Sequence, residues 1–120
     1  MRFLKMMPPL AFRAAFALEV AVIVTLSLIS PSALPGMGIT WGDKVGHLLA
    51  YGVTAGTGFF AFPRRWLVVA GLLTLGLGLE AAQAMGSAGR TAEVGDMIAN
   101  AAGIGLALAV ERLARRGRTS

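Results

Sequence analysis

Long stretches without charge separate the few places where the charged residues of this chain gather. Glu19 is the only charged residue between Arg13 and Asp43, and Glu80 is the only one between Arg65 and Arg90. A helix of about 20 apolar residues crosses the hydrocarbon core of a bilayer. Helices in lipid that are joined by charged loops in water produce this distribution.

The composition agrees with a location in lipid. Of the 120 residues 56% are hydrophobic, and the mean hydropathy is +0.71. A soluble domain of this length has too small a core to bury that much apolar surface. We therefore predict an all-α fold with a single domain over residues 1–120, a bundle of four transmembrane helices at about 11–29, 43–60, 66–85 and 96–113.

The loops between these spans are short. Residues 30–42 are rich in Pro and Gly, and the linker at Arg64 and Arg65 predicts a hairpin of antiparallel helices. The basic N-terminus followed by an apolar run also resembles a secretory signal with cleavage near Ser32 and Ala33. We favour a membrane span, because prolines flank that site and three further spans follow.

The cations predict the orientation. With the N-terminus in the cytoplasm, the inner side holds nine cations, namely Arg2, Lys5, Arg13, Arg64, Arg65, Arg112, Arg115, Arg116 and Arg118, and the outer side holds two, Lys44 and Arg90. Under the positive-inside rule this places both termini in the cytoplasm. The same placement explains the pI near 11.2 without a nucleic-acid partner, because the cations flank apolar spans. The chain has no Cys and so no disulfide or thiolate metal site.

Three of the predicted spans carry polar side chains at helical spacing. These stripes are Asp43, His47 and Tyr51 in the second span, Glu80 and Gln83 in the third, and Asp96, Asn100 and Gly103 in the fourth. The predicted topology brings them to the outer end of the bundle, together with Lys44 and Arg90. Ionisable groups within a span are costly unless they are paired or hydrated, so this cluster is a candidate functional site.

The combined motif resembles the VanZ-like family of small bacterial membrane proteins. The resemblance covers about residues 43–105 and is carried by Asp-Lys-x-x-His-x-x-x-Tyr, Glu-x-x-Gln, an Arg, and Asp-x-x-x-Asn-x-x-Gly. The motif residues are Asp43, Lys44, His47, Tyr51, Glu80, Gln83, Arg90, Asp96 and Asn100. The resemblance implies a multi-pass protein of the bacterial cytoplasmic (inner) membrane, in a family named for a member linked to teicoplanin resistance. It implies no agreed biochemical mechanism.

The chemistry of the cluster is left open by the sequence. Asp43, His47 and Glu80 are the candidates for acid–base catalysis, although a role in hydrogen bonding between helices is favoured. One His with scattered carboxylates lacks the ligand spacing of a zinc site, and no cofactor motif is present, so neither a metal nor a cofactor is expected.

Lys44 and Arg90 admit two interpretations. They clamp a phosphate or carboxylate of a ligand, or they pair internally with the carboxylates of the cluster. The near-neutral charge of the cluster favours internal pairing. Glu19, near the middle of the first span, is expected to be protonated or bonded to Thr74 or a backbone carbonyl, with a proton relay as the less favoured role. The pairs Gly42 with Gly46 and Gly52 with Gly56 predict close helix approach.

We therefore expect a VanZ-like protein of the bacterial cell envelope that binds, modifies or shields an outer-leaflet component and is linked to glycopeptide (teicoplanin) resistance. Its partners are membrane lipids, with an anionic lipid-linked envelope precursor as the candidate ligand, and a homo-oligomer is left open. One rival is a hydrolase or transferase that acts on a lipid-linked phosphate. The other is a purely structural membrane protein.

Overall fold

The computed structural model describes residues 9–28, 41–85 and 94–119, and all regular structure in these residues is α-helical. The helices are α2 (Pro9–Leu28), α3 (Trp41–Ala61), α4 (Arg65–Met85) and α5 (Val94–Thr119). The prediction of an all-helical chain with four helices is confirmed for this part. The last helix continues beyond its predicted end near Leu113, and its basic C-terminal turns suit the negative end of a helix dipole.

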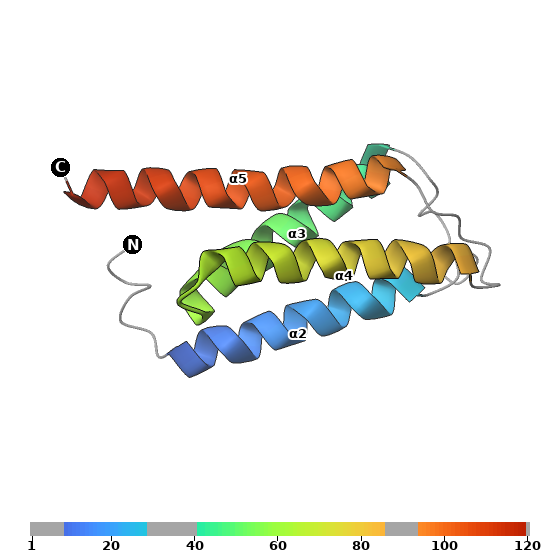
Figure 1. Cartoon of the computed structure of the whole chain (residues 1–120), viewed down its shortest axis with the longest axis horizontal. Helices are drawn as coiled ribbons and strands as arrows, with labels where there is room; N and C mark the ends of the chain where they lie inside the picture. The colour runs from blue at the N-terminus through green and yellow to red at the C-terminus, as the bar shows by residue number, and fades with distance from the viewer. Residues whose placement is uncertain (1–8, 29–40, 86–93, 120) are drawn as a thin grey trace.

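Successive helices run in opposite directions, so the bundle has two distinct ends (Figure 1). The start of α2, the turn between α3 and α4, and the end of α5 lie at one end, which we call the basic end. Its described cations are Arg13, Arg64, Arg65, Arg112, Arg115 and Arg116. We call the opposite end, where α3 and α5 begin, the polar end.

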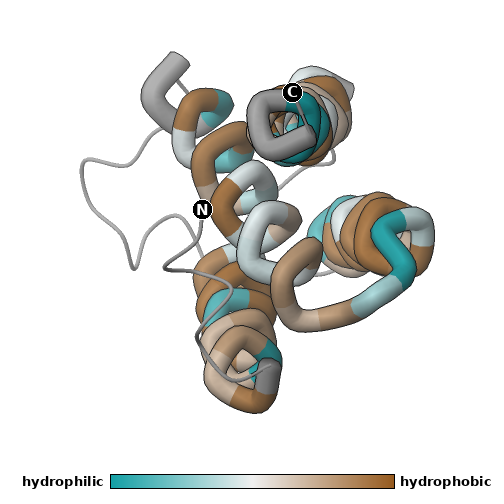
Figure 2. Tube along the Cα trace, turned by 90° about the vertical axis from the view of Figure 1, so that its left-hand side faces the viewer, coloured by the Kyte–Doolittle hydropathy of each residue, from teal (hydrophilic) through white to brown (hydrophobic). Residues whose placement is uncertain are grey.

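α3 is the central helix and packs mainly against α5 and α2. Viewed along the bundle, it runs obliquely between those two helices (Figure 2). Its inward face supplies Tyr51 and Ala55 to the core, where they meet Val68 and Leu72 of α4 and Ile104 of α5. α3 is therefore surrounded by the other helices on several sides.

Beside the apolar core, several polar side chains are buried and many large apolar side chains are exposed, which differs from a soluble protein. The buried polar side chains are Thr54, Glu80, Gln83, Asp96 and Asn100, while large apolar side chains such as Leu18, Leu49, Leu77 and Leu106 are exposed. An apolar surface with polar side chains turned inward is what a hydrocarbon solvent favours.

Three helices are long and apolar enough to cross a membrane, over Leu10–Leu28, Arg65–Gln83 and Gly95–Arg116. α3 is not among them. Its sequence includes Asp43, Lys44 and His47 and several glycines, which lower its hydropathy. α3 is the most enclosed helix, so its polar side chains contact protein. The other helices carry large apolar side chains on their exposed faces.

The backbones of α3 and α5 touch where Gly103 crosses α3. A Cβ at Gly103 would collide with the carbonyl oxygen of Leu48 and lie 3.0 Å from the amide nitrogen of Gly52. A glycine is therefore required at this crossing. The prediction of close approach holds at Gly52 but is wrong at Gly46 and Gly56, where an added Cβ meets nothing within 4 Å.

The hairpin between α3 and α4 turns at Pro63, which lacks the amide hydrogen needed to continue α3. Arg13 of α2 stabilises the end of α3, because its Nε donates to the carbonyl oxygen of Ala61 at 3.0 Å. Its guanidinium also lies 5.3 Å from the centre of the Phe62 ring. These contacts attach the start of α2 to the hairpin.

An ion-pair cluster joins α4 to α5 at the basic end. One carboxylate oxygen of Glu111 lies 3.1 Å from Nε of Arg65 and 2.7 Å from Nε of Arg115. The sequence interpretation did not single out Glu111. The spacing of four residues from Glu111 to Arg115 is a signal that could have identified this pair.

Candidate functional site

Asp96 links two basic side chains across the interface of α3 and α5. Its Oδ1 accepts a hydrogen bond from Nζ of Lys44 at 3.0 Å, and its Oδ2 lies 3.5 Å from Nε2 of His47. Asp96 lies in the first turn of α5, where the helix dipole favours a negative charge. Gly95 makes room for the approach, because a Cβ there would lie 2.7 Å from Cε of Lys44.

Asn100 holds the other side of the imidazole. Its Oδ1 lies 3.0 Å from Nδ1 of His47, and the Asn100 side chain is almost completely buried. In the tautomer with the hydrogen on Nδ1, the ring donates to this oxygen. With the amide rotated, Asn100 donates to Nδ1, and Nε2 of a neutral ring carries the proton that faces Asp96. Both ring nitrogens therefore face protein groups in either arrangement.

α4 is the third helix that contributes to the site, and it closes the site on one side. The rings of His47 and Tyr51 stack with centroids 6.5 Å apart and an interplanar angle of 15°. A Cβ at Gly76 would lie 2.9 Å from Nδ2 of Asn100 and 3.5 Å from the Tyr51 hydroxyl oxygen. One turn further along α4, Glu80 is buried. The missing side chain at Gly76 thus admits Asn100 and Tyr51 to the centre of the bundle.

Gln83, the other polar residue on this face of α4, has a separate partner. Its Nε2 donates to the backbone carbonyl oxygen of Ser27 in α2 at 2.7 Å. This bond connects α4 to the end of α2, away from His47. Gln83 therefore fastens the bundle near the polar end.

Most of the motif residues that the structure describes come together at the polar end. Lys44, His47, Tyr51, Asp96 and Asn100 form one network, with Glu80 beside Tyr51. Asp43 lies in the first turn of α3, but its side chain is outside the described part of the chain, as is the whole of Arg90. The predicted pairing of Arg90 with Glu80 or Asp96 thus also lies outside the described residues.

The described residues offer no set of three His, Cys, Asp or Glu side chains that could hold a metal ion. Among the described side chains that contact His47 or its partners directly, Lys44 and Asp96 form the ion pair, and His47 lies beside Asp96. Such a set can neutralise itself, and it can also orient a bound anion toward the ammonium group.

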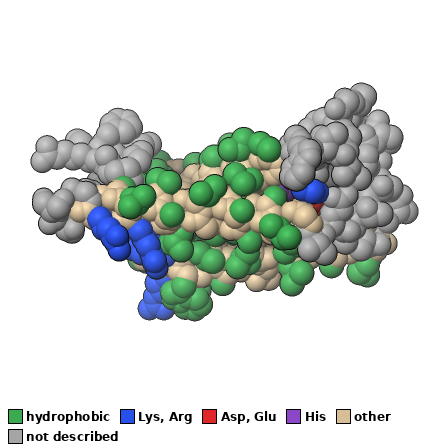
Figure 3. Space-filling model, turned by 90° about the horizontal axis from the view of Figure 1, so that it is seen from above, with side chains coloured by type: hydrophobic (Ala, Val, Ile, Leu, Met, Phe, Trp, Pro, Cys, Tyr) green, Lys and Arg blue, Asp and Glu red, His purple; other side chains and the backbone are tan. Residues whose placement is uncertain are grey.

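The two ions of the pair differ in their access to the surface. The side chain of Lys44 is 27% exposed, that of His47 14% and that of Asp96 5%. Figure 3 shows basic, acidic and histidine side chains together at the surface of this end. The Asp96 side chain is therefore buried, and the Lys44 side chain is the more accessible partner.

Glu19 belongs to a different contact. Its Oε2 accepts a hydrogen bond from the hydroxyl of Thr57 in α3 at 3.1 Å, while Oε1 is buried and has no hydrogen-bond partner. The sequence interpretation suggested Thr74, but Thr74 is exposed on α4. The suggestion was wrong because the helix rotation turns Thr57 toward α2, which spacing along one helix does not reveal.

No protein-family model, no curated protein and no solved structure matches this chain.

Proposed function

We propose that this chain is a VanZ-like multi-pass protein of the bacterial cytoplasmic membrane that binds the anionic headgroup of an outer-leaflet envelope component at its polar end. The observation that carries the proposal is the asymmetry of the Lys44–Asp96 pair, in which the Asp96 side chain is buried and the Lys44 side chain is 27% exposed. Asp96 holds Lys44 in place, and a phosphate or carboxylate that approaches from outside meets the exposed part of the Lys44 side chain.

The membrane setting is supported by the apolar surface of the bundle and by its three apolar helices. The gathering of cations at the basic end supports an orientation with that end in the cytoplasm. The polar end then lies at the outer leaflet, where lipid-linked precursors of the envelope present phosphate groups.

Binding is favoured over catalysis by the surroundings of His47. A general base needs a ring nitrogen that can reach a proton of the substrate. Nδ1 lies beside Asn100 and Nε2 faces Asp96, so the ring is already oriented between two protein groups. This arrangement suits a residue that positions Asp96, which in turn positions Lys44.

The proposal is tested with purified protein in lipid nanodiscs and polyprenyl phosphate as the probe. The wild-type protein is expected to bind the probe in preference to the uncharged polyprenol. Lys44→Met should remain folded and bind at least about tenfold more weakly, because one charge-assisted hydrogen bond is lost. Lys44→Arg, which keeps the charge, is the matched control and should retain most of the affinity.

The rival functions give different results in the same samples. A purely structural protein would show no preference for the phosphate in the wild type, or an unchanged affinity in Lys44→Met. A hydrolase would release inorganic phosphate from polyprenyl diphosphate, and His47→Ala would abolish that release. For the link to glycopeptide resistance, expression in a susceptible strain should raise the inhibitory concentration of teicoplanin, and expression of Lys44→Met should not.

A further inference from the structure

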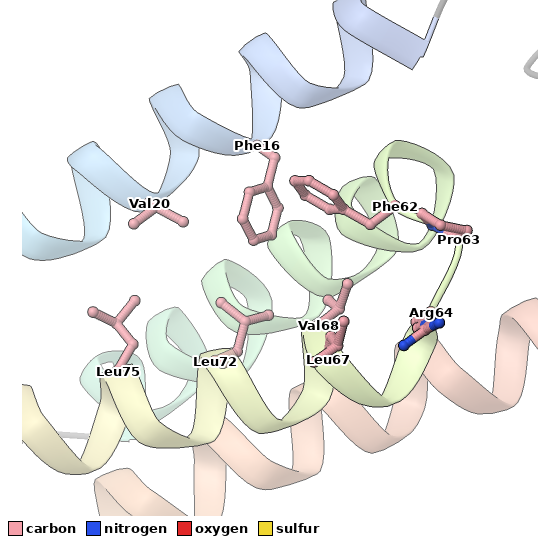
Figure 4. A pocket seen from close by; sticks show the side chains of 10 residues that line it. Phe16, Val20, Phe62, Pro63, Arg64, Leu67, Val68, Leu72 and Leu75 are labelled. Atoms are coloured by element: carbon pink, nitrogen blue, oxygen red, sulfur yellow. The ribbon is translucent and has the colours of Figure 1, made fainter.

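An apolar groove opens between α2 and α4 toward the basic end of the bundle. The two helices meet near the polar end, where Gln83 bonds to Ser27, and diverge from there (Figure 1). The groove has a volume of about 610 Å³. Phe16 and Val20 form one wall, and Leu72 and Leu75 lie on the other (Figure 4). Its size and apolar lining are those of a ligand site.

The groove has the depth of one leaflet. Along α4 it extends from Arg64 to Leu75, which corresponds to roughly 16 Å at the helical rise of about 1.5 Å per residue. Half of a hydrocarbon core of about 30 Å has the same thickness. An extended acyl chain from the leaflet at the basic end therefore fits along the groove.

Two arginines lie where the groove reaches the basic end of the bundle. Arg64 lines it directly, and Arg13 lies over the ring of Phe62, another lining residue. Both side chains are exposed, and neither forms an ion pair with another residue in the described ranges. Arg13 also shares one face of α2 with Phe16 and Val20, at steps of three and seven residues. Two guanidinium groups without a carboxylate partner in the described ranges therefore lie where the headgroup of that lipid would lie.

From this complementarity we infer that the groove between α2 and α4 binds one anionic phospholipid of the surrounding bilayer. The acyl chain packs between Phe16 and Leu72, and the phosphate contacts Arg64 and Arg13. This site lies at the opposite end from Lys44 and depends on the membrane setting alone.

The chain offers a matched pair of glycines for the test. A Cβ added to Gly71 or to Gly78 meets nothing within 4 Å, and both glycines lie in α4, but only Gly71 lines the groove. Gly71→Phe therefore adds a large side chain to one wall of the groove at a position where its Cβ meets no neighbour. Gly78→Phe adds the same side chain to the same helix elsewhere.

The measurement is native mass spectrometry of protein released from vesicles of equal parts phosphatidylglycerol and phosphatidylcholine. We expect the wild-type protein and Gly78→Phe to retain one phosphatidylglycerol, and Gly71→Phe to lose it. Arg64→Gln should lower the preference for phosphatidylglycerol about fivefold, the factor that one cation near an anionic surface contributes.

Retention of phosphatidylglycerol by Gly71→Phe at the wild-type level would overturn the inference, as would an unchanged lipid preference in Arg64→Gln. A dimer in the wild type that dissociates in Gly71→Phe would also overturn it, because a second copy of the chain would then occupy the groove. Lys44→Met should keep the retained lipid, so that a failure here is distinct from a failure of headgroup binding at the polar end.

Discussion

Lys44 and Asp96 meet at 3.0 Å between the first turns of α3 and α5, although 52 positions separate them along the chain. Asp96 also lies 3.5 Å from Nε2 of His47, so one buried carboxylate serves two basic groups. This relationship makes Asp96 and Lys44 unequal in their contributions to stability.

We predict that Asp96→Asn lowers the free energy of unfolding by about 2 kcal/mol, because it leaves Lys44 and His47 without their shared counter-charge. Lys44→Met should cost less, since Asp96 keeps its contact with His47 and the Lys44 side chain is partly hydrated. Unfolding in mixed detergent micelles measures both losses. An equal or larger loss in Lys44→Met would contradict the assignment.

A second prediction concerns the contact between Gly103 and Leu48. Gly103→Ala should lower the free energy of unfolding by about 1–3 kcal/mol, because its methyl group collides with the backbone of α3 and cannot be accommodated by a side-chain rotation. Gly105→Ala in the same helix meets nothing within 4 Å and should be neutral or slightly stabilising. If the two variants unfold alike, the backbones of α3 and α5 do not touch at Gly103.

The hydrogen bond between Thr57 and Glu19 has a matched control in Thr25. Each hydroxyl oxygen lies within hydrogen-bond distance of the carbonyl oxygen four residues earlier, but only the Thr57 hydroxyl shares its one hydrogen with a second acceptor, the Glu19 carboxylate of another helix. Thr57→Val should therefore cost about 0.5–1.5 kcal/mol more than Thr25→Val in the same unfolding assay. Equal costs would show that the bond to Glu19 contributes nothing to stability.

The orientation is tested by cysteine labelling in intact cells, since the chain has no Cys of its own. We predict that a cysteine at Pro63, in the exposed turn of the basic end, reacts only after the membrane is permeabilised. A cysteine at Ser87, in the loop predicted to face outward, should react with a membrane-impermeant reagent before that. The reverse pattern would move the candidate binding site to the cytoplasmic leaflet.

The sequence was sufficient to predict the helices and the stripes of polar residues, because both follow from periodicity along one helix. The charges alone did not identify Asp96 as the partner of Lys44, because the sequence also offered the carboxylates of Asp43 and Glu80. The partner of Lys44 depends on the orientation of α3 and α5 about their helix axes, which determines the side chains that face each other. The same rotation selected Thr57 over Thr74 as the partner of Glu19.

Glycines show the same limit. Spacing of four residues suggested contacts at Gly46, Gly52 and Gly56, whereas only Gly52 of these lies at the crossing, where it meets Gly103 of α5, and the surroundings of Gly42 lie outside the described part of the chain. Glu111 was not identified from the sequence because it lies next to arginines at the end of an apolar span, where charged residues are expected. Its tie to Arg65 depends on the hairpin that brings α4 beside α5.

The central position of α3 has a consequence for how the chain is made. α3 has no stretch apolar enough to cross a membrane by itself, and its side chains Lys44 and His47 contact α5, which the ribosome makes after α3. During synthesis α3 therefore reaches the insertion machinery before the partner of Lys44 and His47 exists. A chain truncated after Gly89 should accordingly leave α3 less fully inserted than the complete chain does, as a glycosylation-site reporter in the adjoining loop would show. The last helix thus acts on the biogenesis of the second one, and substitutions at Asp96 or Asn100 are expected to lower the yield of inserted protein before they affect any ligand.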